Sequence, residues 1–153
     1  MDLWYWNSPL GPLCLTQEGE SLVSLQFCPA VPQDIPGPTP LLAEAQRQLE
    51  EYFAGARTSF DLPLAPHGTP FQQAVWGALL DIPYGETRSY GQIAAAVGRP
   101  KASRAVGGAC HCNPIAIIVP CHRVVGASGS LTGYAGGLDL KAALLALEQK
   151  NPR

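Results

Sequence analysis

The chain has 153 residues, of which 46% are hydrophobic and 14% are charged, and its formal net charge is −2. This length fits one domain or two small ones, and the apolar fraction is too high for a disordered chain. No apolar run is long enough to span a membrane and no signal-peptide pattern is present, so we expect a cytosolic protein. The five cysteines are an odd number, which favours reduced thiols over a disulfide framework.

Charge is distributed unevenly between the two halves of the sequence. Residues 1–84 contain two basic and nine acidic residues, whereas residues 85–153 contain eight basic and three acidic ones, so the balances are −7 and +5. This asymmetry suits a polyanionic partner for the C-terminal half, or is an ordinary fluctuation between two faces.

The N-terminal part of the sequence predicts a small antiparallel sheet followed by one helix. Strands are expected at residues 3–7, 13–16 and 22–27, separated by turn signals. Thr39 and Pro40 favour a helix start, and Gly55 favours its end. The apolar face of this helix is expected to contain Leu42, Ala45, Leu49 and Phe53. An irregular segment then predicts two domains, residues 1–65 with the sheet and residues 66–153.

The C-terminal part predicts several helices around a helix-turn-helix. Capping boxes begin helices at Thr69 and Ser89, and a turn at residues 98–100 leads to a third helix over about residues 101–112. The apolar run at residues 115–119 predicts a buried strand. A Gly- and Ser-rich loop over residues 126–137 precedes a last helix, whose expected apolar face contains Leu140, Ala143, Leu144 and Leu147.

The third helix has two contrasting faces. One is an ordinary core face of Ala102, Ala105, Val106 and Ala109, and the other contains Arg104, Gly107, Gly108 and His111. Two glycines inside a helix cost about 1 kcal/mol each relative to alanine. They indicate either tight packing against another helix or close approach to a narrow partner, and the pattern alone leaves both interpretations open.

Cys121 is the candidate nucleophile. It follows the apolar run and Pro120, and His122 and Arg123 come directly after it. Basic and cationic neighbours help a thiol to lose its proton, which nucleophilic attack requires. The competing interpretation is a buried structural cysteine beside a histidine with satisfied hydrogen bonds.

A wider block of sequence surrounds this cysteine and resembles a known family. Residues 104–124 read Arg-Ala-Val-Gly-Gly-Ala-Cys-His-Cys-Asn-Pro-Ile-Ala-Ile-Ile-Val-Pro-Cys-His-Arg-Val, and further matching motifs lie at residues 85–87, 89–90 and 133–137. Over residues 69–148 the chain resembles the O6-alkylguanine-DNA alkyltransferases, while the first 65 residues are only loosely similar. The resemblance implies a mixed α/β (α+β) fold with a small N-terminal sheet subdomain and a C-terminal domain like a winged helix-turn-helix.

The same resemblance implies a methylated-DNA–protein-cysteine S-methyltransferase that acts in direct-reversal DNA repair. Cys121 would accept the alkyl group irreversibly in a single turnover, without any cofactor. His122 would take the thiol proton through a water and be oriented by Glu148, which is the logic of a catalytic triad. Asn113 would brace the turn that carries the cysteine, and Tyr90 would donate a hydrogen bond to the departing guanine.

The resemblance also implies how the substrate is held. The base pocket would contain Val124, Tyr134, Ala135 and Gly136, with the Ala135 amide facing O6 and the Cys121 and Val124 carbonyls accepting from the exocyclic amine. Family members often have serine at position 135. The third helix would enter the minor groove of alkylated double-stranded DNA and Arg104 would fill the gap left by the flipped nucleotide. The residues expected at the DNA are Arg104, Ser89, Ala102, Ala105, Gly107 and Gly108.

Other functions are weaker matches to the sequence. Residues 110–112, Cys-His-Cys, depart from the family pattern, but a helix directs positions i and i+2 to different faces, so we expect no metal. A lesion sensor of this family would lack the acceptor cysteine, which is present here. A sequence-specific regulator would need Asn, Gln and additional Arg on the recognition helix. We therefore expect a monomer located in the cytoplasm, or in the nucleoid or nucleus with DNA, which repairs O6-alkylguanine, with O4-alkylthymine as an open second substrate.

Overall fold

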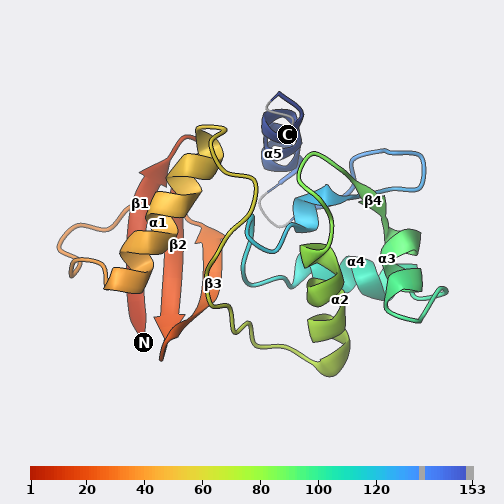
Figure 1. Ribbon diagram of the computed structural model, residues 1–153, viewed down its shortest axis with the longest axis horizontal. Helices are drawn as coiled ribbons and strands as arrows, with labels where there is room; N and C mark the ends of the chain where they lie inside the picture. The colour runs from red at the N-terminus through yellow and green to blue at the C-terminus, as the bar shows by residue number, and fades with distance from the viewer. Residues whose placement is uncertain (135–136, 151–153) are drawn as a thin grey trace. The chain divides into compact units, whose positions relative to one another are not determined.

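The computed structural model describes residues 1–134 and 137–150 and has the expected mixed α/β fold (Figure 1). The chain divides into two compact units, Met1–His67 and Gly68–Arg153. The boundary predicted from the sequence follows residue 65. Within the described residues, no helix is both long and apolar enough to cross a membrane.

The N-terminal unit is a three-stranded antiparallel meander with a helix over it (Figure 1). Strands β1 (Asp2–Ser8), β2 (Gly11–Glu18) and β3 (Ser21–Phe27) pair in chain order, as predicted. Helix α1 (Pro40–Phe53) begins with the Thr39 cap, whose hydroxyl accepts from the Leu42 amide. The prediction for the buried face of α1 is wrong at one position, because Tyr52 is fully buried and Phe53 only half-buried.

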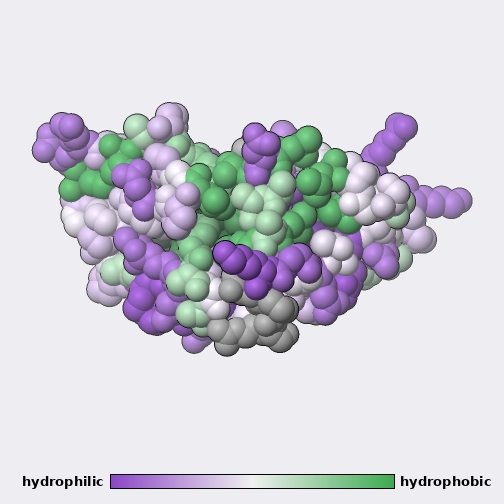
Figure 2. Space-filling model, turned by 90° about the horizontal axis from the view of Figure 1, so that it is seen from above, coloured by the Kyte–Doolittle hydropathy of each residue, from purple (hydrophilic) through white to green (hydrophobic). Residues whose placement is uncertain are grey.

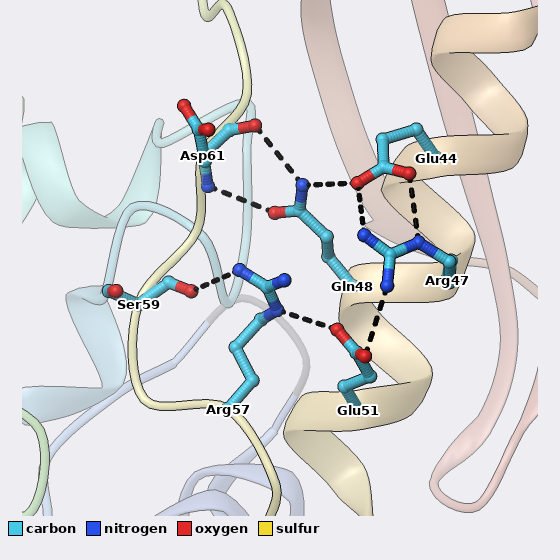
Figure 3. A network of polar contacts seen from close by, with 7 residues as sticks. All are labelled: Glu44, Arg47, Gln48, Glu51, Arg57, Ser59 and Asp61. Carbon is cyan, nitrogen blue, oxygen red and sulfur yellow. Dashed lines mark hydrogen bonds and ion pairs between the residues drawn. The ribbon is translucent and has the colours of Figure 1, made fainter.

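A polar network fixes the segment that leaves α1 (Figure 3). The side-chain amide of Gln48 bonds the backbone of Asp61 twice, donating to its carbonyl at 3.1 Å and accepting from its amide at 2.9 Å. Arg57 donates to Glu51 at 2.9 Å and to the Ser59 carbonyl at 3.0 Å. These bonds satisfy backbone groups that no strand pairs, so the network has a structural role in this unit.

The described residues of the C-terminal unit form four α-helices, and local sequence signals determine where two of them begin. Helix α2 (Pro70–Leu80) and helix α3 (Tyr90–Ala96) both start with the predicted capping boxes, at Thr69 and Ser89. Helix α4 is Ser103–His111 and helix α5 is Leu138–Lys150. The buried indole of Trp76 donates to the Ala109 carbonyl at 2.9 Å and thereby joins α2 to α4.

A short strand pair joins the start of α3 to the segment after Cys121. Strand β4 (Arg88–Ser89) pairs in parallel with β5 (Val124–Val125), which follows the 3-10 turn η1 (Cys121–Arg123). Ser89 is therefore the partner of Val125, and Tyr90 starts α3 directly beside the region of the cysteine. Two residues per strand are too few for a period-2 pattern, so the sequence did not predict this pair.

The predicted strand at residues 115–119 is wrong. These residues form a buried turn in which the Val119 amide bonds the Ile115 carbonyl at 3.1 Å and Ile117 has a φ of 70°. A short apolar run reports burial but does not distinguish an extended strand from a compact turn.

The apolar core includes Leu13, Leu15 and Leu25 in the first unit and Val75, Val106 and Ile115 in the second. Figure 2 shows hydrophilic and apolar residues intermixed on the visible face. Among the described residues the exposed large apolar side chains are Met1, Leu3, Leu80, Leu131 and Leu138.

Candidate active site

The buried turn presents Cys121 in one fixed position. Asn113, just after α4, donates from its side-chain amide to the Val119 carbonyl at 2.9 Å and to Cys121 Sγ at 3.2 Å. Its side-chain oxygen accepts from the Ile115 amide at 3.0 Å. One amide therefore braces both ends of the turn and the thiol itself, and Cys121 is only 5% exposed.

His122 and Glu148 form a buried pair next to this turn. His122 Nε2 lies 2.7 Å from Glu148 Oε2, and both side chains are inaccessible to solvent. An ionised carboxylate only accepts hydrogen bonds, so the ring proton belongs on Nε2. Among the described residues Nδ1 has no hydrogen-bond partner, which leaves its lone pair free to take a proton. Burial lowers the pKa of His122, although Glu148 opposes this effect, so the ring is neutral near pH 7.

Arg123 holds the Glu148 carboxylate with two hydrogen bonds. Its Nε donates to Oε1 at 2.8 Å and its Nη2 to Oε2 at 3.0 Å, while Nη1 donates to the Ile82 carbonyl at 2.8 Å. The Gly85 amide adds a bond of 3.3 Å to Oε1, and its φ of 80° is a backbone conformation that glycine adopts without strain. The carboxylate thus joins α5 to η1 and to the loop after α2.

The cation that acts on Cys121 is Lys141 of α5. Burial raises the pKa of Cys121, while the Asn113 hydrogen bond and the charge of Lys141 lower it. Lys141 is itself fully buried, and its Nζ donates to the Val124 carbonyl at 2.5 Å and to the Thr132 carbonyl at 2.9 Å. Since burial outweighs these effects, the resting thiol keeps its proton, and attack requires a base.

Cys121 opens into a cavity of about 220 Å³. Its lining also contains Tyr90, Gly107, Cys110, His111, Gly133 and Tyr134. A second hollow shares Tyr90 and Gly107 with it and adds Ser103, Arg104 and Thr132. The Tyr90 hydroxyl lies 2.7 Å from Thr132 Oγ1, whereas the buried Tyr134 hydroxyl has no hydrogen-bond partner among the described residues. The cavity therefore offers a flat aromatic lining, polar atoms and a thiol in one place.

The outer face of α4 is made of small residues and one long cation. Arg104, Ala105 and Gly108 are exposed, whereas Val106 and Ala109 are buried. The predicted core position of Ala105 is therefore wrong. A Cβ at Gly108 would meet nothing within 4 Å, and one at Gly107 would meet only the Tyr90 ring at 3.8 Å. Tight helix packing thus does not explain the two glycines.

The remaining predicted residues fall in three places. Ser89 caps α3 by accepting from the Gln92 amide at 3.1 Å, and half-buried Ala102 is the N-cap of α4. Val124 is buried in β5, and its carbonyl accepts from Lys141. Ala135 and Gly136 lie outside the described residues.

Comparisons with known proteins identify the family. The family model for the 6-O-methylguanine DNA methyltransferase DNA binding domain matches residues 70–150, and that for the ribonuclease-like domain matches residues 4–66. A methylated-DNA–protein-cysteine methyltransferase of Methanosarcina acetivorans is 56% identical over 148 residues, covering 94% of this chain and 95% of the relative. One of Mycobacterium tuberculosis is 55% identical, covering 94% and 89%.

The chain belongs to the methylated-DNA–protein-cysteine methyltransferase family.

Solved structures of this family have the same fold. The crystal structure of Mycobacterium tuberculosis OGT in complex with DNA matches with a TM-score of 0.90 and 53% identity, covering 99% of this chain and 94% of that one. An O6-methylguanine DNA methyltransferase from Methanococcus jannaschii matches with a TM-score of 0.68 and 30% identity, covering 93% and 90%. The family, the fold class and the enzyme class expected from the sequence are confirmed.

Sequence reasoning missed two parts of this methyltransferase site. The sequence did not lead us to predict a role for Lys141. Lys141 and Glu148 are nevertheless seven residues apart and share the buried face of α5 with Leu144. Two ionisable residues at core positions of a helix are a readable signal, because unpaired charges there are costly. The sequence analysis also predicted that Arg123 helps the Cys121 thiol to lose its proton, whereas Arg123 forms an ion pair with Glu148. Among the described residues, no three His, Cys, Asp or Glu side chains cluster as metal ligands.

Proposed function

We propose that this chain repairs alkylated double-stranded DNA by moving an alkyl group from O6 of guanine to its own Cys121, once per molecule. The observation that carries this proposal is a buried thiol that opens into a cavity and is followed directly in the chain by His122, which Glu148 holds by a hydrogen bond. The names of the relatives and the DNA complex of the Mycobacterium tuberculosis protein support the same reaction.

In the transfer the thiol loses one proton, and the released guanine anion takes up one proton from water. We assign the first to His122 Nδ1, through a water, because this atom is buried and without a partner among the described residues while Nε2 is held by Glu148. Sγ then attacks the alkyl carbon, the carbon–O6 bond breaks, and its electron pair leaves with the guanine. Tyr90 donates a hydrogen bond to that leaving base after exchanging its contact with Thr132. The thioether product has no path back, so each molecule acts once.

The base enters the cavity after it has been flipped out of the duplex. Flipping costs a few kcal/mol and is needed because O6 of a stacked guanine cannot reach a buried thiol. The Tyr134 ring lines the cavity. The Val124 carbonyl already accepts from Lys141, but a carbonyl has a second lone pair for the exocyclic amine of guanine. The Cys121 carbonyl completes the described part of the proposed base pocket; Ala135 and Gly136, which the family resemblance assigns to it, lie outside the described residues.

The DNA-facing surface is the outer face of α4, together with the start of α3 at Ser89. The minor groove is about 6 Å wide, and a helix enters it only with small side chains. Ala105, Gly107 and Gly108 meet that requirement without crowding the protein, and Arg104 extends beyond them next to the cavity. In this proposal residues 66–153 bind DNA and transfer the alkyl group, residues 1–65 form a separate subdomain, and the protein acts as a monomer in the compartment that contains the DNA.

The test separates binding from chemistry. Cys121→Ala removes the acceptor but leaves the cavity and α4 in place, so the variant should bind a duplex containing O6-methylguanine and remove no methyl group. Cys112→Ser, at an exposed thiol nearby, is the matched control and should do both. Methyl removal by Cys121→Ala would overturn the assignment of the acceptor, and loss of lesion binding would overturn the division of roles.

A further inference from the structure

Cys110 is a second thiol in the cavity of Cys121. It lies in the last turn of α4, is 8% exposed, and lines the same space of about 220 Å³. Asn113 connects the two cysteines, because its backbone amide donates to the Cys110 carbonyl at 3.2 Å and its side chain donates to Cys121 Sγ at 3.2 Å. The neighbouring Cys112 is exposed and is not among the residues that line the cavity.

We propose that Cys110 captures bifunctional alkyl groups, so that an adduct with a leaving group on its second carbon ends as a bridge between Cys110 and Cys121. This inference rests on the proposed function, since Cys121 must accept the group first. The substrate class is O6-alkylguanine whose alkyl group carries a halide on its β-carbon, for example a 2-chloroethyl group.

Each step of the proposed reaction balances without an oxidant or a cofactor. Transfer leaves Cys121 as a 2-chloroethyl thioether and releases guanine. The thioether sulfur then displaces chloride from the second carbon and forms a three-membered cyclic sulfonium ion. The sulfur of Cys110 attacks a ring carbon, the electron pair of the broken carbon–sulfur bond returns to Cys121 Sγ, and the Cys110 proton passes to water. The product is an ethylene bridge between two thioethers, and the net loss is one HCl.

The cavity favours Cys110 over the competing nucleophiles, which are water and the DNA. Two groups held in one site react with an effective molarity of about 10⁵ M or more when they are well oriented, which far exceeds the concentration of water. Burial raises the pKa of Cys110 to about 12, and the negative charge of a Cys121 thiolate adds to this rise. The Cys121 thiol is neutral at rest, and the sulfonium ion places a positive charge at its sulfur, so Cys110 becomes easier to deprotonate when its reaction partner appears.

The experiment compares two duplexes with the intact protein, one with O6-methylguanine and one with freshly prepared O6-(2-chloroethyl)guanine. The methyl duplex tests the proposed function, and failure to methylate Cys121 there overturns that function rather than this inference. With the chloroethyl duplex, peptide mapping should find the Cys110 and Cys121 side chains joined by one ethylene unit, without chlorine. A 2-hydroxyethyl group on Cys121, or a Cys121–DNA cross-link as the main product, overturns the inference.

Two variants sharpen this result. Cys110→Ser removes the capturing thiol with the smallest change in volume, and its products should move entirely to the hydroxyethyl thioether and the DNA cross-link. Cys112→Ser is the matched control and should still give the bridge. If Cys112→Ser loses the bridge, the wrong cysteine has been assigned.

Discussion

The buried Arg123–Glu148 pair offers a quantitative test of how this site is built. Glu148→Gln keeps the volume and removes the charge, which leaves Arg123 as a buried cation that is 6% exposed and without its counter-ion. Breaking one side of a buried pair costs about 3–5 kcal/mol of unfolding free energy. Arg123→Met takes away two hydrogen bonds and the counter-ion of the buried carboxylate, so we expect a loss of the same size.

The double variant separates charge pairing from simple loss of contacts. It removes both charges, and the main remaining cost is the Ile82 carbonyl, which loses its Arg123 donor at about 1–3 kcal/mol. The double variant should therefore lose less unfolding free energy than the sum of the two single losses. The difference, which is the coupling energy, should be at least about 3 kcal/mol. Equilibrium unfolding in guanidinium gives the free energies, and hydrogen exchange of the α5 amides assigns the loss to this unit.

The rate of alkyl transfer should depend on which ring nitrogen of His122 carries the proton. Glu148→Gln no longer fixes the proton on Nε2, so the rate of alkyl transfer should fall by about 10²–10⁴, the usual contribution of a positioned base. Single effects that add within about 0.5 kcal/mol in the double variant would refute the coupled pair. An unchanged transfer rate in Glu148→Gln would refute the role of His122 as the base.

Further predictions concern the DNA face, the flipped base, Lys141 and pH. Gly108→Leu should weaken duplex binding at least about tenfold without lowering the unfolding free energy, since its Cβ meets nothing within 4 Å and leucine forms helix better than glycine; binding titrations check this against Ala43→Leu on the exposed face of α1, which should bind normally. Arg104→Ala should slow transfer from a duplex more than reaction with free O6-benzylguanine, and equal losses in the two assays would mean that Arg104 is structural. Lys141→Met removes the cation that lowers the pKa of Cys121, so the pH profile of Cys121 alkylation by iodoacetamide should move to higher pH; an unmoved profile would contradict this. The pKa of His122 is lowered from 6.5 in the folded chain, so the unfolded chain binds the extra proton just below that pH, and the unfolding free energy should rise with pH up to about 6.5. Denaturation curves of His122→Gln should lack this part of the slope, and a wild-type slope of the opposite sign would contradict the buried neutral ring.

Local signals in the sequence were sufficient for most of the fold. The caps at Thr39, Thr69 and Ser89 predicted three helix starts, because a cap is a bond between residues three positions apart. The meander followed from turn residues between short apolar strands in the same way. The prediction failed at residues 115–119, where side-chain bonds from Asn113 select a turn that the apolar pattern cannot distinguish from a strand.

The sequence predicted which residues belong to the site better than it predicted the contacts between them. The resemblance named Cys121, His122, Asn113 and Glu148, and the structure pairs Asn113 with Cys121 and His122 with Glu148. The partners of Lys141 and Arg123 depend on which loops pack against α5, and no spacing in the sequence encodes that. Likewise, only the packed structure distinguishes Cys110, in the cavity, from exposed Cys112 two residues later.

The most direct test of the central claim is the intact mass of the protein after one equivalent of a duplex containing O6-methylguanine, followed by peptide mapping. Each protein molecule should gain one CH₂ unit, located on Cys121, and the duplex should then contain ordinary guanine. A methyl group on Cys110 or Cys112, or tight lesion binding with no gain in mass, would contradict the claim.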